Sequence, residues 1–227
     1  MNYGVMLLSP IFLVRVFDVH AYGQYREFIL YAMLFSGLIG FSVNTNLLYF
    51  IPKYPARERQ SVTSTALLIL LASIVGTAAI LLAGDVLRGR MSYDFVVPLA
   101  AYVFFFINLD FYEHFWLGKK RTDYVLYFSS ARIAVRTLVV VGIAYATRNV
   151  QSVLWGMVAI EAVKCALMLA LFRRFFSRAL DFALVREQLR FVVPLGSASV
   201  LSLVNSQIAN LAISLKMGVE RLALYSI

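Results

Sequence analysis

The sequence predicts an all-α membrane protein, a polytopic bundle of about seven transmembrane helices. Hydrophobic residues make up 61% of the 227-residue chain and charged residues 15%, whereas soluble domains are about 45–50% apolar and about 25% charged. The apolar residues form long runs, many of them near the length of about 20 residues that a membrane-spanning helix requires. Short charged segments separate these runs, which is the pattern of helices that face lipid.

The apolar runs divide the chain into spans. Seven segments qualify or nearly qualify: Tyr3–Phe17, Tyr25–Phe50, Val62–Ala83, Phe95–Leu117, Tyr124–Ala146, Ser152–Phe172 and Phe191–Leu215. The closing residues Leu222–Ile227 would begin an eighth. We therefore expect a six-helix N-terminal lobe over 1–172, a linker over 173–190 and the incomplete start of a second lobe over 191–227. The short first span and the abrupt end suggest part of a longer protein.

The formal net charge of +9 could indicate nucleic-acid binding, but the basic residues gather in loops between apolar runs. Cytoplasmic loops carry such an excess of Lys and Arg, so we expect no nucleic-acid partner. One set of alternating loops holds eleven basic residues: Lys53, Arg57, Arg59, Lys119, Lys120, Arg121, Arg173, Arg174, Arg178, Arg186 and Arg190. The other set holds seven: Arg15, Arg26, Arg88, Arg90, Arg148, Lys216 and Arg221. The first set should face the cytoplasm, together with the N-terminus.

The loop Arg173–Arg190 is the longest and combines arginines with regularly spaced apolar residues. Phe176, Leu180 and Leu184 step by four along the chain. This spacing favours an amphipathic helix at the membrane surface, with its arginines near anionic headgroups. A helix that binds a partner protein is the alternative.

Several predicted spans contain ionisable residues, which are costly at membrane depth and usually face the bundle interior. Helices rise by a constant 1.5 Å per residue, so two antiparallel spans that share a turn can be matched by depth. Turning around Lys120–Thr122 places Asp110 level with Arg132. Turning around Arg148–Asn149 places Arg136 level with Glu161, and Lys164 follows Glu161 by three residues.

Two interpretations of these charges stay open. Asp110, Arg132 and Glu161 could form structural ion pairs, or could couple transport to an ion. Arg136 and Lys164 could instead line a cavity for an anionic substrate. Arg15 and Arg26, on either side of the first turn, could belong to that cavity or extend to the headgroups.

The seventh span carries a polar stripe at helical spacing: Ser199, Ser202, Ser206 and Asn210. Such a stripe can hydrogen-bond to other helices or line a wet groove for a sugar. No catalytic or metal-binding motif occurs in the chain, so we expect neither an enzyme nor a bound metal or cofactor.

Two stretches resemble the polysaccharide-transporter branch of the multidrug/oligosaccharidyl-lipid/polysaccharide flippase superfamily. The first is LVRVFDVHAYGQYREFILYAMLFSGLIG at 13–40, in which Arg15, Tyr22, Gly23 and Tyr25 match the family pattern. The second is FVVPLGSASVLSLVNSQIANLAISLKMGVERLALYSI at 191–227, with Pro194 early in the seventh span. Relatives often carry an acidic–basic pair late in that span, where this chain has Ala209 and Asn210.

The resemblance implies two six-helix lobes around a cationic cavity, in a bacterial inner membrane. It also implies flipping of a polyprenyl-diphosphate-linked oligosaccharide to the outer leaflet, for an O-antigen or another surface polysaccharide, with Arg15 in the cavity. Lipids and other polysaccharide-assembly proteins are the further partners expected. The alternatives are a cation-coupled drug antiporter using Asp110 or Glu161, a membrane enzyme of polysaccharide synthesis, and a structural scaffold.

The basic loops give the first testable prediction. Single cysteines at positions 56 and 148 should react with a membrane-impermeant thiol reagent from opposite sides of the membrane, because the Lys and Arg excess places the first position in the cytoplasm. Labelling of both positions from outside intact cells would contradict the predicted orientation.

Overall fold

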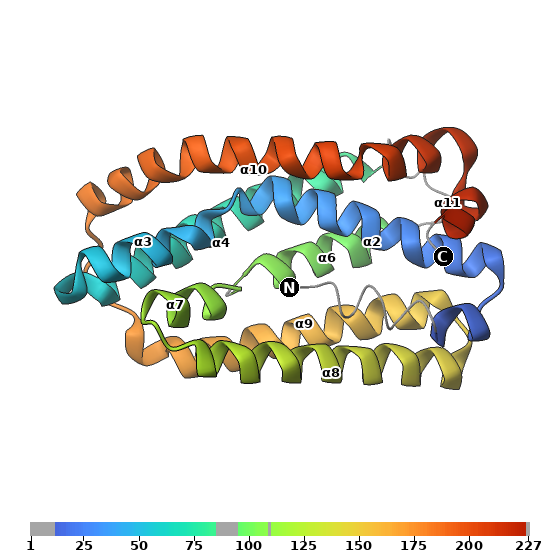
Figure 1. Ribbon diagram of the computed structural model, residues 1–227, viewed down its shortest axis with the longest axis horizontal. Coiled ribbons are helices and arrows are strands. Elements are labelled where there is room, and N and C mark those ends of the chain that lie inside the picture. Colours follow the sequence, from blue (N-terminus) through green and yellow to red (C-terminus); the bar gives the residue numbers. More distant parts are fainter. Residues whose placement is uncertain (1–11, 85–94, 109, 226–227) are drawn as a thin grey trace.

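A computed structural model describes residues 12–84, 95–108 and 110–225. These residues contain no strand and fold into an elongated bundle of roughly parallel helices (Figure 1). The longer helices are α2 (Val19–Gly40), α4 (Glu58–Leu82), α6 (Val96–Ile107), α8 (Thr122–Thr147), α9 (Val150–Phe172) and α10 (Phe182–Met217). The short ones are η1 (Val43–Thr45), α3 (Asn46–Lys53), η2 (Pro55–Arg57), α7 (Tyr112–Gly118), η3 (Arg173–Phe175) and α11 (Val219–Tyr225).

The described residues contain five helices long and apolar enough to cross a membrane, or six when a bent pair counts as one span. These six correspond to the second to seventh predicted spans, which confirms the all-α polytopic fold. Of the predicted first span, only residues 12–17 are among the described residues. Arg88 and Arg90 lie outside the described residues. Large apolar side chains project from the outer helices, including Leu82, Leu138 and Leu201, as lipid-facing surfaces require.

The helices pack in layers. α6 lies at the centre and packs against α2, α4 and α9, while α8 packs outside α9. On the opposite side α10 packs against α2, α3 and α4, as Figure 1 shows. The three basic loops lie at one end of this bundle, where ion pairs join Lys119 to Glu58 and Arg57 to Asp181. The structure thus places them on one side of the bundle, as predicted.

Two predicted spans are interrupted. The second bends by 49° between Val19–Gly40 and Val43–Lys53, because Phe41 and Ser42 adopt left-handed backbone angles of φ 42° and 54°. The fourth breaks between α6 and α7, where Asn108 is extended. Broken helices are costly in lipid unless the freed backbone groups are covered by protein or line a cavity.

The prediction that residues 173–190 form a separate surface helix is wrong. Helix α10 begins at Phe182 and continues through the seventh span to Met217. Asp181 caps its start, accepting hydrogen bonds from the backbone N–H groups of Ala183 and Leu184 at 3.0 and 3.2 Å. Within this stretch Leu184 is buried, and the side chain of buried Gln188 donates to the carbonyl of Ser61 in α4 at 3.2 Å. The stretch therefore packs on protein along this face.

The close packing of α11 on α2 gives the second prediction. A methyl group on Gly23 would collide with the backbone carbonyl of Val219, so Gly23→Ala should destabilise the fold by about 1–3 kcal/mol through overpacking. Gly142 in α8 has open space around it, and Gly142→Ala should be neutral or stabilise by about 0.5–1 kcal/mol. Melting curves in detergent compare the two, and equal melting temperatures would contradict the contact.

Candidate functional site: a buried charge network beside a polar cleft

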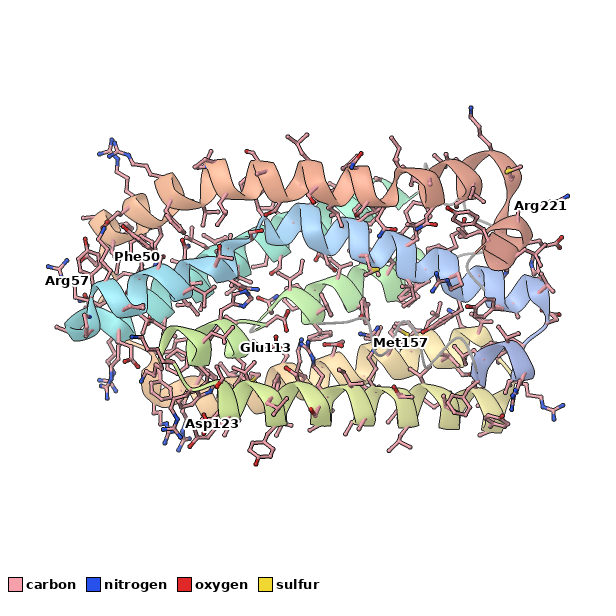
Figure 2. The ribbon with its side chains drawn as sticks, viewed as in Figure 1. Phe50, Arg57, Glu113, Asp123, Met157 and Arg221 are labelled. Carbon is pink, nitrogen blue, oxygen red and sulfur yellow. The ribbon has the colours of Figure 1, made fainter. Side chains whose placement is uncertain are left out.

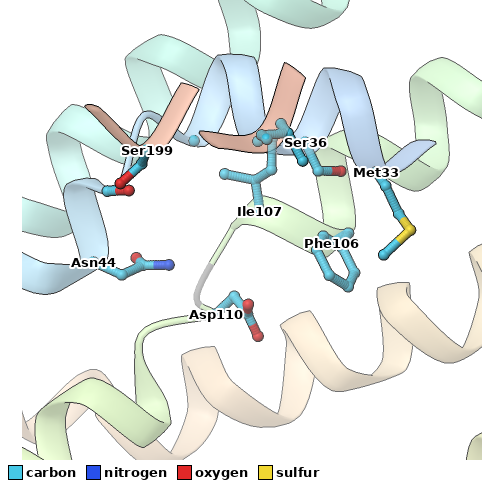
Figure 3. Close-up of a pocket in the computed structure, with 11 residues that line it drawn as sticks. Met33, Ser36, Asn44, Phe106, Ile107, Asp110 and Ser199 are labelled. Carbon is cyan, nitrogen blue, oxygen red and sulfur yellow. The ribbon is translucent and has the colours of Figure 1, made fainter. Parts of the chain in front are cut away.

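The site is built around the break between α6 and α7. Asn108 ends α6, and its side-chain amide donates both to the carbonyl of Phe104 and to the hydroxyl of Ser73 in α4, each at 2.8 Å. These bonds anchor the break to α4. The chain then leaves the helix axis, which places Asp110 between α2 and the α8–α9 pair (Figure 3).

Three carboxylates and three cationic side chains meet at this break. Arg132 of α8 contacts Asp110 at 2.9 Å and Glu113 at 3.1 Å. Lys164 of α9 contacts Glu161 at 2.8 Å and Asp110 at 3.6 Å. The remaining contact joins Arg136 to Glu161 at 4.0 Å. We call these six residues (Asp110, Glu113, Arg132, Arg136, Glu161 and Lys164) the charge network.

The charge network lies in the bundle interior. The side chains of Glu161 and Lys164 are only 3% and 8% exposed. Figure 2 shows Glu113 inside the molecule, whereas Arg57 and Arg221 project from its two ends. With all six groups ionised the network carries no net charge, which is the condition under which charges are tolerated at this depth.

Lys164 also covers the end of a helix. Its ammonium group donates to the carbonyl of Phe106 at 3.1 Å, one of the carbonyls that the end of α6 leaves without a helical partner. A cation at a helix C-terminus interacts favourably with the helix dipole. Lys164 is therefore held by two carboxylates and a carbonyl.

The structure tests how the predicted residues are placed. Both depth-matched pairs, Asp110 with Arg132 and Arg136 with Glu161, are in contact. The predicted cationic residues lie in three different settings. Arg136 and Lys164 share Glu161, Arg26 is half-buried in α2, and Arg15 is exposed before α2 begins.

Arg136 and Arg26 share one neighbour. Both lie within electrostatic range of the buried phenol of Tyr25. The guanidinium group of Arg136 also lies over the ring of Tyr102 at 5.6 Å, a cation–π geometry. Arg136 is thus held by the ring of Tyr102 and by an ion pair longer than those of Arg132 and Lys164.

The polar stripe on α10 divides into two parts. Ser199 lines a cleft beside the charge network. Ser202 and Ser206 are exposed, and Ser206 donates to the carbonyl of Leu203 in its own helix at 2.8 Å. Asn210 is half-buried and donates to Gln207 at 2.8 Å. These hydrogen bonds of Ser206 and Asn210 thus stay within α10.

The cleft that Ser199 lines lies between α2, the α6–α7 break and α10, and its volume is about 300 Å³. Figure 3 shows Ser36 and Met33 on α2, Asn44 after the bend, Phe106 and Asp110 at the break, and Ser199 opposite. Sequence reasoning missed this cleft. It also missed Glu27, a buried acid inside the second span that accepts a hydrogen bond from Ser214 at 2.8 Å.

The fold and this interior define a class, the multi-pass helical membrane proteins that keep compensated charges inside the bundle. A model of the polysaccharide biosynthesis protein family matches residues 1–227. The chain therefore belongs to that family, which is the family of the polysaccharide transporters that its sequence resembles. No curated protein and no solved structure matches the chain significantly.

The sharing of partners in the charge network gives the third prediction. Asp110→Asn alone or Lys164→Gln alone should lower stability by up to about 3–5 kcal/mol, because each leaves a buried charge incompletely compensated. The double variant should recover much of that loss, since it leaves Arg132 with Glu113 and Arg136 with Glu161. Melting temperature and the folded fraction in detergent measure both effects.

The control is an exchange of charges. Asp110→Arg combined with Arg132→Asp would rescue an isolated pair, but here it sets a guanidinium group beside Lys164 and a carboxylate beside Glu113. Rescue by the exchange, with no rescue by the neutral double variant, would contradict the network.

Proposed function

We propose that the protein flips a polyprenyl-diphosphate-linked oligosaccharide from the cytoplasmic to the outer leaflet of a bacterial inner membrane. Membership of the polysaccharide biosynthesis family supports a membrane transport role in making such polymers. A diphosphate crossing the membrane interior needs cationic partners inside the bundle. In this proposal the lipid tail stays in the bilayer while the polar part passes through the protein.

The observation that carries the proposal is the loose pairing of Arg136. Its 4.0 Å contact with Glu161 is the longest in the charge network. Arg136 and Arg26 also both lie within electrostatic range of Tyr25. Arginine suits this role, because its planar guanidinium group binds phosphate oxygens through two parallel hydrogen bonds. Arg136 and Arg26 are therefore our candidates for binding the diphosphate, with Arg15 near the entrance.

Substrate binding would then exchange one ion pair for another. When Arg136 turns to a phosphate, Glu161 still has Lys164 at 2.8 Å, so no buried carboxylate loses all its partners. The cost of an orphaned buried charge is thereby avoided. Alternating access by rocking of one helix bundle against the other would carry the bound diphosphate across, with α10 at the boundary and the N-terminus in the cytoplasm.

A cation-coupled antiporter is the second candidate. It would use Asp110 or Glu161 to bind a proton or a metal cation. Both carboxylates already contact two cationic side chains, which compete with any further cation. The pairing therefore favours an anionic substrate over this alternative.

Substitution of arginine gives the fourth prediction. Arg136→Ala and Arg136→Lys should both slow the appearance of lipid-linked oligosaccharide in the outer leaflet, because lysine keeps the charge but loses the planar fork. Arg26→Ala and Arg15→Ala should also slow it. The measurement is outer-leaflet glycan in cells that depend on this protein, normalised to its abundance in the membrane.

Arg121→Ala is the control. Arg121 is exposed and pairs only locally with Asp123 at 3.1 Å, so its loss should leave translocation unchanged. Full activity of all three alanine variants at positions 15, 26 and 136 would overturn the proposed cationic path.

A further inference from the structure

The cleft beside the charge network combines polar groups from three parts of the chain. α2 contributes Ser36, the bend after α2 contributes Ser42 and Asn44, and α10 contributes Ser199. Asp110, at the α6–α7 break, also lines the cleft (Figure 3). The volume of about 300 Å³ falls at the small end of ligand pockets and suits a sugar unit better than a whole oligosaccharide.

Two polar atoms around this cleft have no hydrogen-bond partner among the described residues. They are the hydroxyl of Ser36, a residue only 8% exposed, and the side-chain oxygen of Asn44. Buried polar atoms are nearly always hydrogen-bonded, because leaving one unpaired is costly. Both belong to residues that line the cleft, so an occupant of the cleft can supply the missing bonds.

The charge at the cleft constrains what that occupant is. Among the described residues that line the cleft, Asp110 is the only ionisable one, and its carboxylate contacts Arg132 and Lys164. With its charge compensated, Asp110 attracts neither a cation nor an anion strongly, yet its oxygens can still accept hydrogen bonds. Phe106 and Met33 add apolar surface against which the C–H face of a sugar ring can pack.

We infer that this cleft binds hydroxyl groups of the glycan, with Ser36, Asn44 and Asp110 as hydrogen-bond acceptors. The inference rests on the proposed function and divides its substrate between two places. Arg136 and Arg26 hold the diphosphate, while the cleft selects the sugar. A site built to bond hydroxyl groups discriminates strongly against analogues that lack them, so the cleft determines which glycan is moved.

The test removes one unpaired polar atom at a time. Ser36→Ala and Asn44→Ala should each reduce outer-leaflet glycan about three- to tenfold per lost hydrogen bond, measured with a lectin or an antibody against the surface polysaccharide in cells depending on the protein. Ser36→Ala should also leave the melting temperature in detergent unchanged or raise it, because it removes a buried polar atom without a partner in the protein. A purely structural serine would give the opposite result.

Ser64→Ala is the matched control. Ser64 in α4 is also buried, and its hydroxyl also lacks a partner among the described residues, but it does not line the cleft. Its loss should leave export unchanged. Equal export by Ser36→Ala and wild type, while Arg136→Ala fails, would overturn the sugar site and keep the proposed function. Unchanged export by Ser36→Ala, Asn44→Ala and Arg136→Ala alike would overturn both.

Discussion

The cost of burying charge inside a membrane determines the architecture around the α6–α7 break. Six ionisable side chains can remain there only if each carboxylate has a cationic partner within reach. Those partners come from α8 and α9, so meeting this condition fixes how these two helices are rotated toward α6 and α7. The same contacts let α6 stop at mid-bundle, because Lys164 covers the carbonyl of Phe106.

The two faces of the bundle have different chemistry. Toward α8 and α9, the interior is ionic and carries no net charge. Apart from the ion pairs at the basic end, the described contacts toward α10 include a hydrogen bond from Ser214 to the buried carboxylate of Glu27. Tyr49 also stacks on Phe191 at 4.7 Å, and Gly196 allows Phe41 to approach α10. Such contacts tolerate sliding and separation better than buried ion pairs, whose rupture exposes charge to lipid. The α10 face is therefore the better candidate for movement.

Much of this fold follows from the sequence, because apolar run length and constant helical rise determine the spans and their depths. Depth matching also identified Asp110 with Arg132 and Arg136 with Glu161, both of which the structure brings into contact. It could not show that Lys164 and Glu113 share these partners, since that depends on helix rotation and on the break at Asn108. The break itself depends on Ser73, 35 residues away in the chain. The start of helix α10 could have been predicted, because Asp181 is a recognisable N-cap residue. The arginines around Asp181 instead favoured the prediction of a membrane-surface segment.

Asp110 connects the two halves of the proposed site. One of its oxygens contacts Arg132 and Lys164, and the residue also lines the cleft. Lys164 in turn contacts Glu161, the partner of Arg136.

A hydrogen bond from a sugar to Asp110 would weaken the attraction of Asp110 for Lys164 and leave Lys164 freer to hold Glu161. Glu161 would then compete less with a phosphate group for Arg136. Occupation of the cleft would therefore favour release of Arg136 to the phosphate. Through this chain of contacts, glycan and diphosphate would each increase the affinity of the other, because such coupling is reciprocal. A substrate carrying both groups would then be bound more tightly than either part alone.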